Sequence, residues 1–411
     1  MPKSLWLLII GMVINMTGAS LLWPLNTIYI VDHLGKSLSV SGLILMLNAA
    51  AGVIGNLVGG FLFDRIGGYK SIISGIIVTL VAVTLLIFFH SFTYYVIFII
   101  IIGFGSAVVF PGMYAMAGAV WPSGGRKPFN AIYVATNFGV ALGAAIGGFV
   151  ASFKFSLVFT VNALMLVLFL VIALLTYKSI ETEIHKMKDI EVVKPTIQIK
   201  NKAKFMALMV LCIGYFLCWI GYVQWQSTIS IYTQQLNVSL KQYSLLWTIN
   251  GALIVLGQPI VSFIIHHFNR ALKVQILIGI GIFILSFLIV GNAVSFTGFL
   301  VAMIVLTIGE MLAWPAIPTI ANDLAPSGKA GFYQGIVNST ATGGRMIGPL
   351  LGGVIVDHFN IESLFYVIIF FYIIAAIATL FYDKTLKASD LLNVIDNNSQ
   401  TKSTGNNYKV L

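Results

Sequence analysis

The chain has 411 residues, of which 59% are hydrophobic and only 9% are charged, and its mean hydropathy is +0.98. Soluble domains carry about 25% charged residues, so this composition excludes a water-soluble globular fold. The hydrophobic residues also fall into runs of roughly 20 or more, the length that a helix needs to cross a hydrocarbon core ~30 Å thick. The composition therefore predicts a membrane protein.

These runs lack the polar alternation of barrel strands, so each is expected to be a helix that satisfies its own backbone hydrogen bonds. The pattern predicts an all-α membrane protein with twelve spans, at residues 4–31, 39–63, 71–90, 94–121, 128–152, 156–176, 204–232, 240–265, 273–292, 296–321, 330–356 and 361–382.

Two polar segments lie outside the spans and divide the chain. We expect an N-terminal six-helix bundle at 1–176, a linker loop at 177–203, a C-terminal six-helix bundle at 204–382 and a disordered tail at 383–411. Neither polar segment is long enough to hold a hydrophobic core of its own. The first span has no small-residue cleavage site, so we expect it to stay in the protein.

The net charge of +10 is distributed unequally between the two sides of the membrane. Of the 23 Lys and Arg residues, 19 lie on the side that holds both termini and the central loop. Loops rich in Lys and Arg stay in the cytoplasm, so we expect a multi-pass protein of the plasma membrane with both termini cytoplasmic. The positive charge is thereby explained by topology, and we expect no nucleic-acid partner.

The two halves of the chain repeat each other. At an offset of 204 residues, Pro111 corresponds to Pro315, and the Pro-Ser-Gly triplet at 122–124 corresponds to the triplet at 326–328. Because each half holds an even number of spans, both halves have the same orientation, and a substrate is expected to bind between them near the middle of the membrane.

The turn between the second and third spans reads GGFLFDRIGGYKS. This motif resembles the cytoplasmic signature of the major facilitator superfamily, although Gly68 stands where that family usually has Arg. The resemblance implies a secondary transporter of two six-helix halves. Asp64 is then expected to face the positive N-terminal end of a helix in the other half and to hold one conformation. The residues predicted to form this conformational latch are Gly60, Asp64, Arg65, Gly67 and Lys70.

Glycines recur in the fifth and eleventh spans in a pattern similar to the drug:proton antiporter branch of the superfamily. Glycines at these spacings let helices approach closely, and simple helix packing explains them equally well. A further signature of that branch, an Arg in the fourth span, is replaced by Ile99. The residues predicted to pack helices are Gly139, Gly143, Gly147, Gly148, Gly344, Gly348, Pro349, Gly352 and Gly353.

Two ionisable residues stand near the middle of spans, where charge is costly and usually functional. Glu310 lies in the tenth span and Arg345 in the eleventh, at depths that differ by roughly 6 Å, so they could meet across adjacent helices. We expect Glu310 to carry a proton and Arg345 to tune it. The alternatives are a static ion pair that fixes packing and direct contact with a charged substrate.

In the superfamily, the first, fourth, seventh and tenth spans line the cavity, and aromatic and amide side chains in these spans suit an amphipathic or cationic organic substrate. The residues predicted to line it are Asn15, Asn26, Tyr114, Tyr215, Trp219, Tyr222, Gln226 and Trp314. Packing and aromatic belts account for part of this set.

The sequence favours a proton-coupled exporter of lipophilic or cationic drug-like molecules that works by alternating access. The alternative is a permease or exporter for a specific metabolite such as a sugar, amino acid, peptide or siderophore, and less favoured is a receptor or membrane enzyme. No GxxxxGK[ST] phosphate loop is present, so ATP is not expected as the energy source. We expect small-molecule substrate, protons and membrane lipid as partners, a monomer, no cofactor, no metal site and no enzymatic activity.

Overall fold

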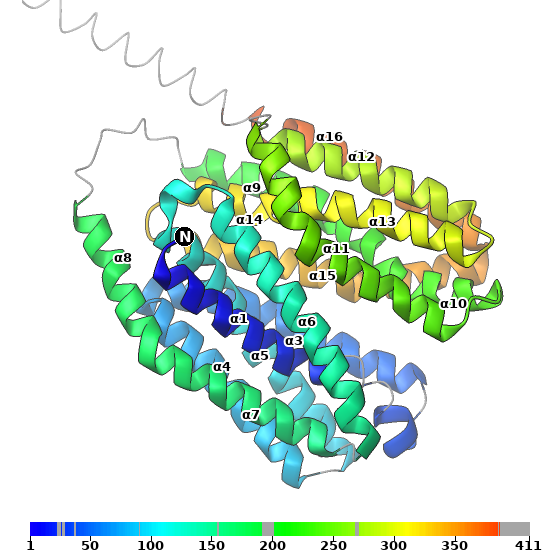
Figure 1. Cartoon of the computed structure of the whole chain (residues 1–411), viewed down its shortest axis with the longest axis horizontal. Coiled ribbons are helices and arrows are strands. Elements are labelled where there is room, and N and C mark those ends of the chain that lie inside the picture. Colours follow the sequence, from blue (N-terminus) through cyan, green and yellow to red (C-terminus); the bar gives the residue numbers. More distant parts are fainter. Residues whose placement is uncertain are drawn as a thin grey trace, which may run out of the picture.

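The computed structural model describes residues 1–22, 26, 29–36, 38–89, 91–153, 156–190, 201–267, 271–384 and 386. All regular elements in these ranges are helices, and they form two bundles that lie side by side (Figure 1). The first half comprises α1 (Lys3–Leu22), η2 (Tyr29–His33), α3 (Leu38–Ile66), α4 (Gly68–Phe88), α5 (Phe92–Val120), η3 (Pro122–Gly124), α6 (Lys127–Phe153), α7 (Ser156–Ile172), η4 (Ala173–Tyr177) and α8 (Lys178–Ile190).

The second half begins after the central segment and has its own core, to which α9, α12, α13 and α16 contribute. It comprises α9 (Asn201–Tyr222), η5 (Val223–Trp225), α10 (Thr228–Gln235), α11 (Leu240–His267), α12 (Leu272–Gly291), α13 (Phe296–Ala313), α14 (Ala316–Leu324), α15 (Ala330–His358) and α16 (Ile361–Phe381).

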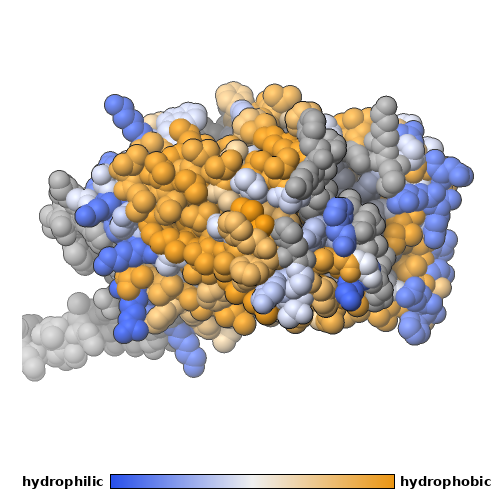
Figure 2. Space-filling model, turned by 90° about the horizontal axis from the view of Figure 1, so that it is seen from below, coloured by the Kyte–Doolittle hydropathy of each residue, from blue (hydrophilic) through white to orange (hydrophobic). Residues whose placement is uncertain are grey.

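The all-α fold with twelve spans is confirmed. Within the described residues, eleven helices are long and apolar enough to cross a membrane, and α15 is the twelfth span. With 29 residues α15 is long enough to cross, but it carries Arg345 and many small polar residues. The surface agrees with this reading, because a broad band of hydrophobic residues separates two ends at which hydrophilic residues gather (Figure 2).

Several predicted spans are interrupted in the structure. The first was expected to run to residue 31; the structure describes α1 as Lys3–Leu22, a helical residue at Asn26 and a short π-helix, η2, at Tyr29–His33, and residues 23–25, 27 and 28 lie outside the described residues. The tenth is divided into α13 and α14, because Pro315 has no N–H to continue the helix after Trp314. The seventh is also divided, by the 3-10 turn η5 between α9 and α10, although no proline lies there.

The central segment was expected to be a loop, but its first part is a helix. The chain passes from α7 through η4 directly into α8. Ser4 of α1 donates a hydrogen bond to Glu183 of α8 (2.5 Å), which ties this helix to the first half. Residues 191–200 and most of the tail lie outside the described residues.

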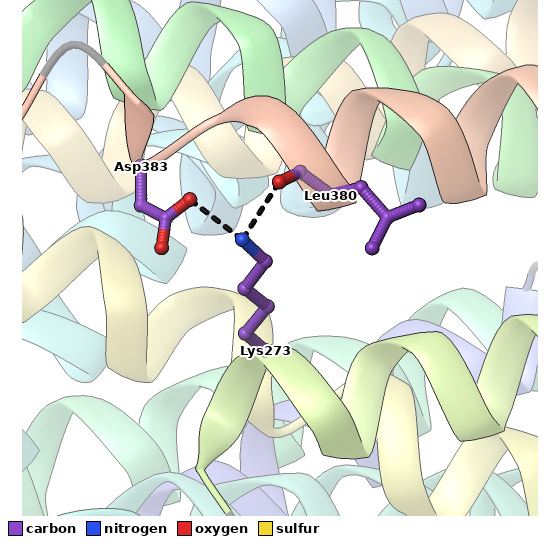
Figure 3. A network of polar contacts seen from close by, with 3 residues as sticks. All are labelled: Lys273, Leu380 and Asp383. Carbon is purple, nitrogen blue, oxygen red and sulfur yellow. Dashed lines mark hydrogen bonds and ion pairs between the residues drawn. The ribbon is translucent and has the colours of Figure 1, made fainter.

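An ion pair in the second half joins the start of α12 to the residues that follow α16 (Figure 3). Lys273, at the start of α12, contacts Asp383 just beyond α16 (2.6 Å) and donates a hydrogen bond to the carbonyl of Leu380 (2.7 Å). Since both partners are partly exposed, we expect a contribution of about 0–1 kcal/mol to stability.

Candidate functional site between the two halves

Glu310 lies at the boundary between the halves and is 3% exposed. Its Oε1 accepts a hydrogen bond from the hydroxyl of Tyr133 on α6 (2.9 Å). Its Oε2 accepts from the hydroxyl of Tyr222 on α9 (3.1 Å) and from the side-chain amide of Asn250 on α11 (3.0 Å). Asn250 is held in turn by Thr307, one turn before Glu310 on α13 (2.9 Å). The carboxyl group is therefore surrounded by uncharged hydrogen-bond donors.

Tyr133 is the partner that comes from the other half of the molecule. Its ring belongs to the hydrophobic core of the second half, although its helix belongs to the first. A single carboxyl group thus contacts both bundles.

Arg345 does not form the ion pair with Glu310 that the sequence suggested. Its guanidinium lies over the ring of Trp219 (4.6 Å to the centroid) and donates a hydrogen bond to Thr342 (3.2 Å). Within the part of the chain that the structure describes, the ion pair is Lys273–Asp383. The two mid-span charges therefore occupy separate sites.

Four of the predicted cavity residues form one aromatic cluster. Trp314 stacks on Trp219, with ring centroids 5.0 Å apart and an interplanar angle of 5°. Tyr215 and Tyr222 each meet Trp314 edge to face, at 5.4 and 5.7 Å. Gln226 does not extend this face, because α9 ends at Tyr222 and Gln226 follows the 3-10 turn.

The other predicted cavity residues lie apart from this cluster. Asn15 is buried in α1, and Asn26 accepts a hydrogen bond from Tyr95 on α5 (2.9 Å) inside the first half. Tyr114 stacks on Phe129 of α6 (6.5 Å) and lies within electrostatic range of Arg345. The structure therefore brings Tyr114 close to the second half and keeps Asn26 inside the first.

Asp64 lies at the end of α3 and joins the two halves. Its Oδ1 accepts a hydrogen bond from the backbone N–H of Gly331 (2.9 Å), and its Oδ2 accepts one from that of Phe332 (2.8 Å). These N–H groups belong to the first turn of α15, where the helix carries partial positive charge. We refer to this end of the molecule as the latch end.

The other predicted latch residues shape the turn around Asp64. A Cβ on Gly60 would overlap the carbonyl of Gly331, so the glycine permits backbone contact between the halves. Gly67 has φ +90°, which an L side chain rarely adopts, and it lies against Glu181 of α8. Arg65 and Lys70 are exposed.

Arg126 forms a second contact between the halves, which we call the Arg126 clasp. Its Nη2 donates to the carbonyl of Met311 (2.5 Å), its Nη1 to Gln275 and its Nε to Asn130 (2.9 Å). Asn130 continues the network to Ser262 on α11 (2.9 Å). Burial lowers the pKa of Arg126 to about 10, so it remains positively charged at neutral pH.

In the sequence, Arg126 is one of the 19 basic residues on the side of both termini, and its charge indicates topology alone. Its position two residues after the repeated Pro-Ser-Gly triplet at 122–124 was the available signal. Nothing in that pattern indicates that the side chain reaches α12 and α13 of the other half.

The predicted packing glycines contact the neighbouring helix within their own half. A Cβ on Gly139 would lie 2.7 Å from the carbonyl of Val13 on α1, and a Cβ on Gly344 would lie 2.6 Å from Cβ of Trp219 on α9. Gly353 differs, since nothing lies within 4 Å of its Cβ position. The remaining members are also close to α1 (Gly143, Gly147) or to α9, η5 and α10 (Gly348, Gly352), Pro349 lies within α15, and the surroundings of Gly148 are outside the described residues.

Two bundles that cross the membrane, with a buried carboxyl group between them and polar contacts at one end, define a membrane transporter of two similar halves. The sequence profile of the Major Facilitator Superfamily matches residues 8–345 and 211–403. The chain belongs to this superfamily, and it is a secondary transporter, not an enzyme.

Comparison with known proteins agrees with this assignment. The chain is 56% identical over 393 residues to YttB, an uncharacterized MFS-type transporter of Bacillus subtilis (strain 168), covering 96% of this chain and 98% of that protein. It is 25% identical to the quinolone resistance protein NorA of Staphylococcus aureus (strain MSSA476), over 90% of this chain and 94% of NorA. The structure of the human organic anion transporter MFSD10 (TETRAN) has a TM-score of 0.73 at 15% identity, covering 92% of this chain and 100% of that chain.

Proposed function

We propose that this protein is a proton-coupled exporter of amphipathic small molecules, that it works by alternating access and that Glu310 binds the proton. The observation that carries the proposal is the buried carboxyl group of Glu310, which has only uncharged donors around it and contacts both halves. A permanent structural charge at this depth would need a cationic partner.

The surroundings of Glu310 suit both protonation states. The hydroxyls of Tyr133 and Tyr222 donate to the ionised carboxylate, and each can rotate to accept a hydrogen bond from the protonated form. Because Tyr133 belongs to the other half, its hydrogen bond with Glu310 is a contact between the halves. This contact differs between the two protonation states of Glu310. This difference is what coupling of proton binding to a conformational change requires.

The contacts at the latch end support alternating access. Asp64 and the Arg126 clasp join the halves at two places: Asp64 connects α3 to α15, and Arg126, just before α6, contacts α12 and α13. We propose that this end faces the cytoplasm, since most Lys and Arg residues lie on that side, and that the structure represents the state closed there. Export then requires both sets of contacts to open and reform.

The aromatic cluster around Trp219 and Trp314 supports an amphipathic substrate. Flat rings bind aromatic and aliphatic bodies without demanding one hydrogen-bonding pattern. NorA, a distant relative, is named for quinolone resistance, and the similar human structure is named an organic anion transporter. A substrate that joins an aromatic body to an ionisable group is consistent with both.

Transport in proteoliposomes under an imposed pH gradient tests the proposal. The probes are a quinolone, the lipophilic cation ethidium and 2-naphthoate. We expect the gradient to drive accumulation of at least one probe by the wild-type protein, and Glu310→Gln to abolish this accumulation while downhill exchange remains. Glu362→Gln is the matched control, because it makes the same chemical change at an exposed residue at the start of α16.

Gradient-driven accumulation by Glu310→Gln at the wild-type rate would contradict the assignment of the proton site. Failure of the wild-type protein to respond to the gradient with any probe would contradict proton coupling. Loss of accumulation in Glu362→Gln as well would show that the effect is not specific to Glu310.

A further inference from the structure

One face of α15 packs against α3 of the first half through a series of close contacts. Gly331 contacts the backbone of Gly60, and a Cβ on Gly335 would lie 2.6 Å from the carbonyl of Asn56. Ser339 donates a hydrogen bond to the carbonyl of Val53 (2.9 Å). From Gly331 to Ser339, these contacts lie progressively farther from the latch end.

Thr342, farther along α15, also contacts α3. It accepts a hydrogen bond from Asn56 (3.3 Å), and Gly52 lies beside its methyl group (3.5 Å from the Cβ position). Arg345 follows three residues later on the same face of the helix, because residues three and four apart are neighbours on a helix surface. Arg345 therefore lies one turn beyond the contact of Thr342 with α3.

Arg345 is accessible although it lies at the midpoint of a membrane-spanning helix. Its side chain is exposed, and it faces the other half, where Tyr114 is within electrostatic range. A charged side chain at this depth is stable when it faces a space between helices that solvent can enter. Among the described residues no carboxylate pairs with it, and its hydrogen bond to Thr342 uses one of five N–H donors.

The position of Arg345 over Trp219 leaves the other N–H groups of its guanidinium available to bind a ligand. A guanidinium contacts an aromatic ring through its flat face, whereas its N–H groups point outward in its own plane. An arginine held in this way can form two parallel hydrogen bonds to a carboxylate or a sulfonate. It also occupies the face of Trp219 that an organic cation would need, and it repels such a cation.

We propose that Arg345, with Trp219 and Thr342, forms a subsite for the anionic group of an amphipathic organic anion, such as an aromatic carboxylate or sulfonate. The inference rests on the proposed transport function and names its substrate class. It replaces the expectation that Arg345 tunes Glu310, and it reverses the charge expected for the substrate from its aromatic cavity alone. When Glu310 is protonated, Arg345 is the remaining formal charge among the mid-span residues that the structure describes, and an anion neutralises it.

Equilibrium binding to the purified full-length protein tests this subsite without any gradient. The probes share one ring system and differ in charge: 2-naphthoate, its neutral analogue 2-naphthamide and the cation 2-naphthylmethylammonium. We expect the wild-type protein to bind naphthoate about tenfold or more tightly than the amide, and the cation most weakly.

Arg345→Gln should weaken naphthoate binding about tenfold or more while amide binding changes little. Arg345→Lys should give an intermediate affinity, since it keeps the charge and loses the paired geometry. Lys36→Gln is the matched control, because Lys36 is also an exposed cation over an aromatic ring, Phe92 (4.7 Å), at a distance from the interface. Unchanged amide binding and melting temperature show that Arg345→Gln is folded.

The inference is overturned if the wild-type protein prefers the cation, if it binds none of the probes, or if Arg345→Gln binds naphthoate as tightly as the wild type. These outcomes are separate from failure of the proposed function. Binding at equilibrium does not need Glu310 to carry protons, so Glu310→Gln should retain the preference for naphthoate. A protein that binds naphthoate through Arg345 but ignores the pH gradient would contradict proton coupling alone.

Discussion

The hydroxyl of Tyr133, on α6 of the first half, donates a 2.9 Å hydrogen bond to Oε1 of Glu310, on α13 of the second half. Seven residues before Tyr133 on the chain, Arg126 donates to the carbonyl of Met311, the residue next to Glu310. Tyr133 in α6 and Arg126 just before it thus both contact α13, the first at the side chain of Glu310 and the second at the backbone carbonyl of Met311. The candidate proton site and the Arg126 clasp therefore form a continuous set of contacts.

Tyr133→Phe removes the hydrogen bond to Glu310 and keeps the buried ring. We expect the state closed at the latch end to lose about 1 kcal/mol, which raises the population of the open state roughly fivefold. The measurement is the distance between spin labels on exposed Ser123 and Ala271, one in each half at the latch end, with the buried Cys212 and Cys218 replaced by alanine.

Tyr94→Phe provides the control for this change. Tyr94 is 47% exposed on the same half, and its ring packs against Phe89 and Phe98. The label distance should be the same as in the parent protein. A distance distribution for Tyr133→Phe that matches that of Tyr94→Phe would show that the bond to Glu310 does not hold the halves together.

Asp64→Asn keeps the shape of the latch side chain and removes its charge. The amide has one oxygen to accept hydrogen bonds, and it loses the attraction to the helix N-terminus, so we expect a cost of about 2 kcal/mol to the closed state. The open population in the same label experiment should rise roughly 30-fold. Proton-driven transport should fall, because the cycle needs the closed state to reform.

The control is Asp357→Asn, at the opposite end of α15, where the carboxylate is exposed. This variant should keep the parental label distances and the parental transport rate. Equal behaviour of the two asparagine variants would refute the role of Asp64 as a latch.

Gly335→Ala tests the close contact of α3 and α15. The added Cβ would lie 2.6 Å from the carbonyl of Asn56, so the helices must move apart. We expect the closed state to be lost while each half remains folded. Gly353 lies on the same helix, and nothing lies within 4 Å of its Cβ position. Gly353→Ala should therefore raise the free energy of unfolding by about 1 kcal/mol, because alanine has the higher helix propensity.

Melting temperature and label distance together separate these effects. If Gly335→Ala closes at the latch end as the parent protein does, the backbone contact is not what sets the spacing of the two halves.

The fold could be predicted from the sequence because membrane spans depend on local composition. Runs of apolar residues and the repeat of Pro111 at Pro315 indicated two six-helix halves without any knowledge of tertiary contacts. Helix interruptions were missed because they depend on single residues inside apolar runs. Tyr222 ends α9 inside a segment, Lys202–Gln235, that is as a whole long and apolar enough to cross a membrane.

The candidate site was harder to predict, because it combines atoms from both halves. Glu310 was found since a carboxyl group in an apolar span is conspicuous. Its partners Tyr133 and Asn250 are ordinary residues of membrane spans, and nothing in the sequence distinguishes them. Arg345 was placed beside Glu310 because the two residues lie at similar depth, but its side chain points from α15 toward Trp219. Side-chain direction across an interface requires the docked structure.

The contact of α3 with α15 has a consequence for how the protein responds to temperature. Gly60, Gly331 and Gly335 meet the opposite backbone directly, and Ser339 and Thr342 add hydroxyl groups, so backbone and hydroxyl groups form much of this seam beside the ring of Phe63. Separation of the two helices therefore exposes peptide and hydroxyl groups to water together with apolar surface. Hydration of apolar surface is the main source of a positive heat-capacity change, and polar surface lowers it. The balance between open and closed states should accordingly shift little across the growth range of the cell, unlike the stability of either bundle.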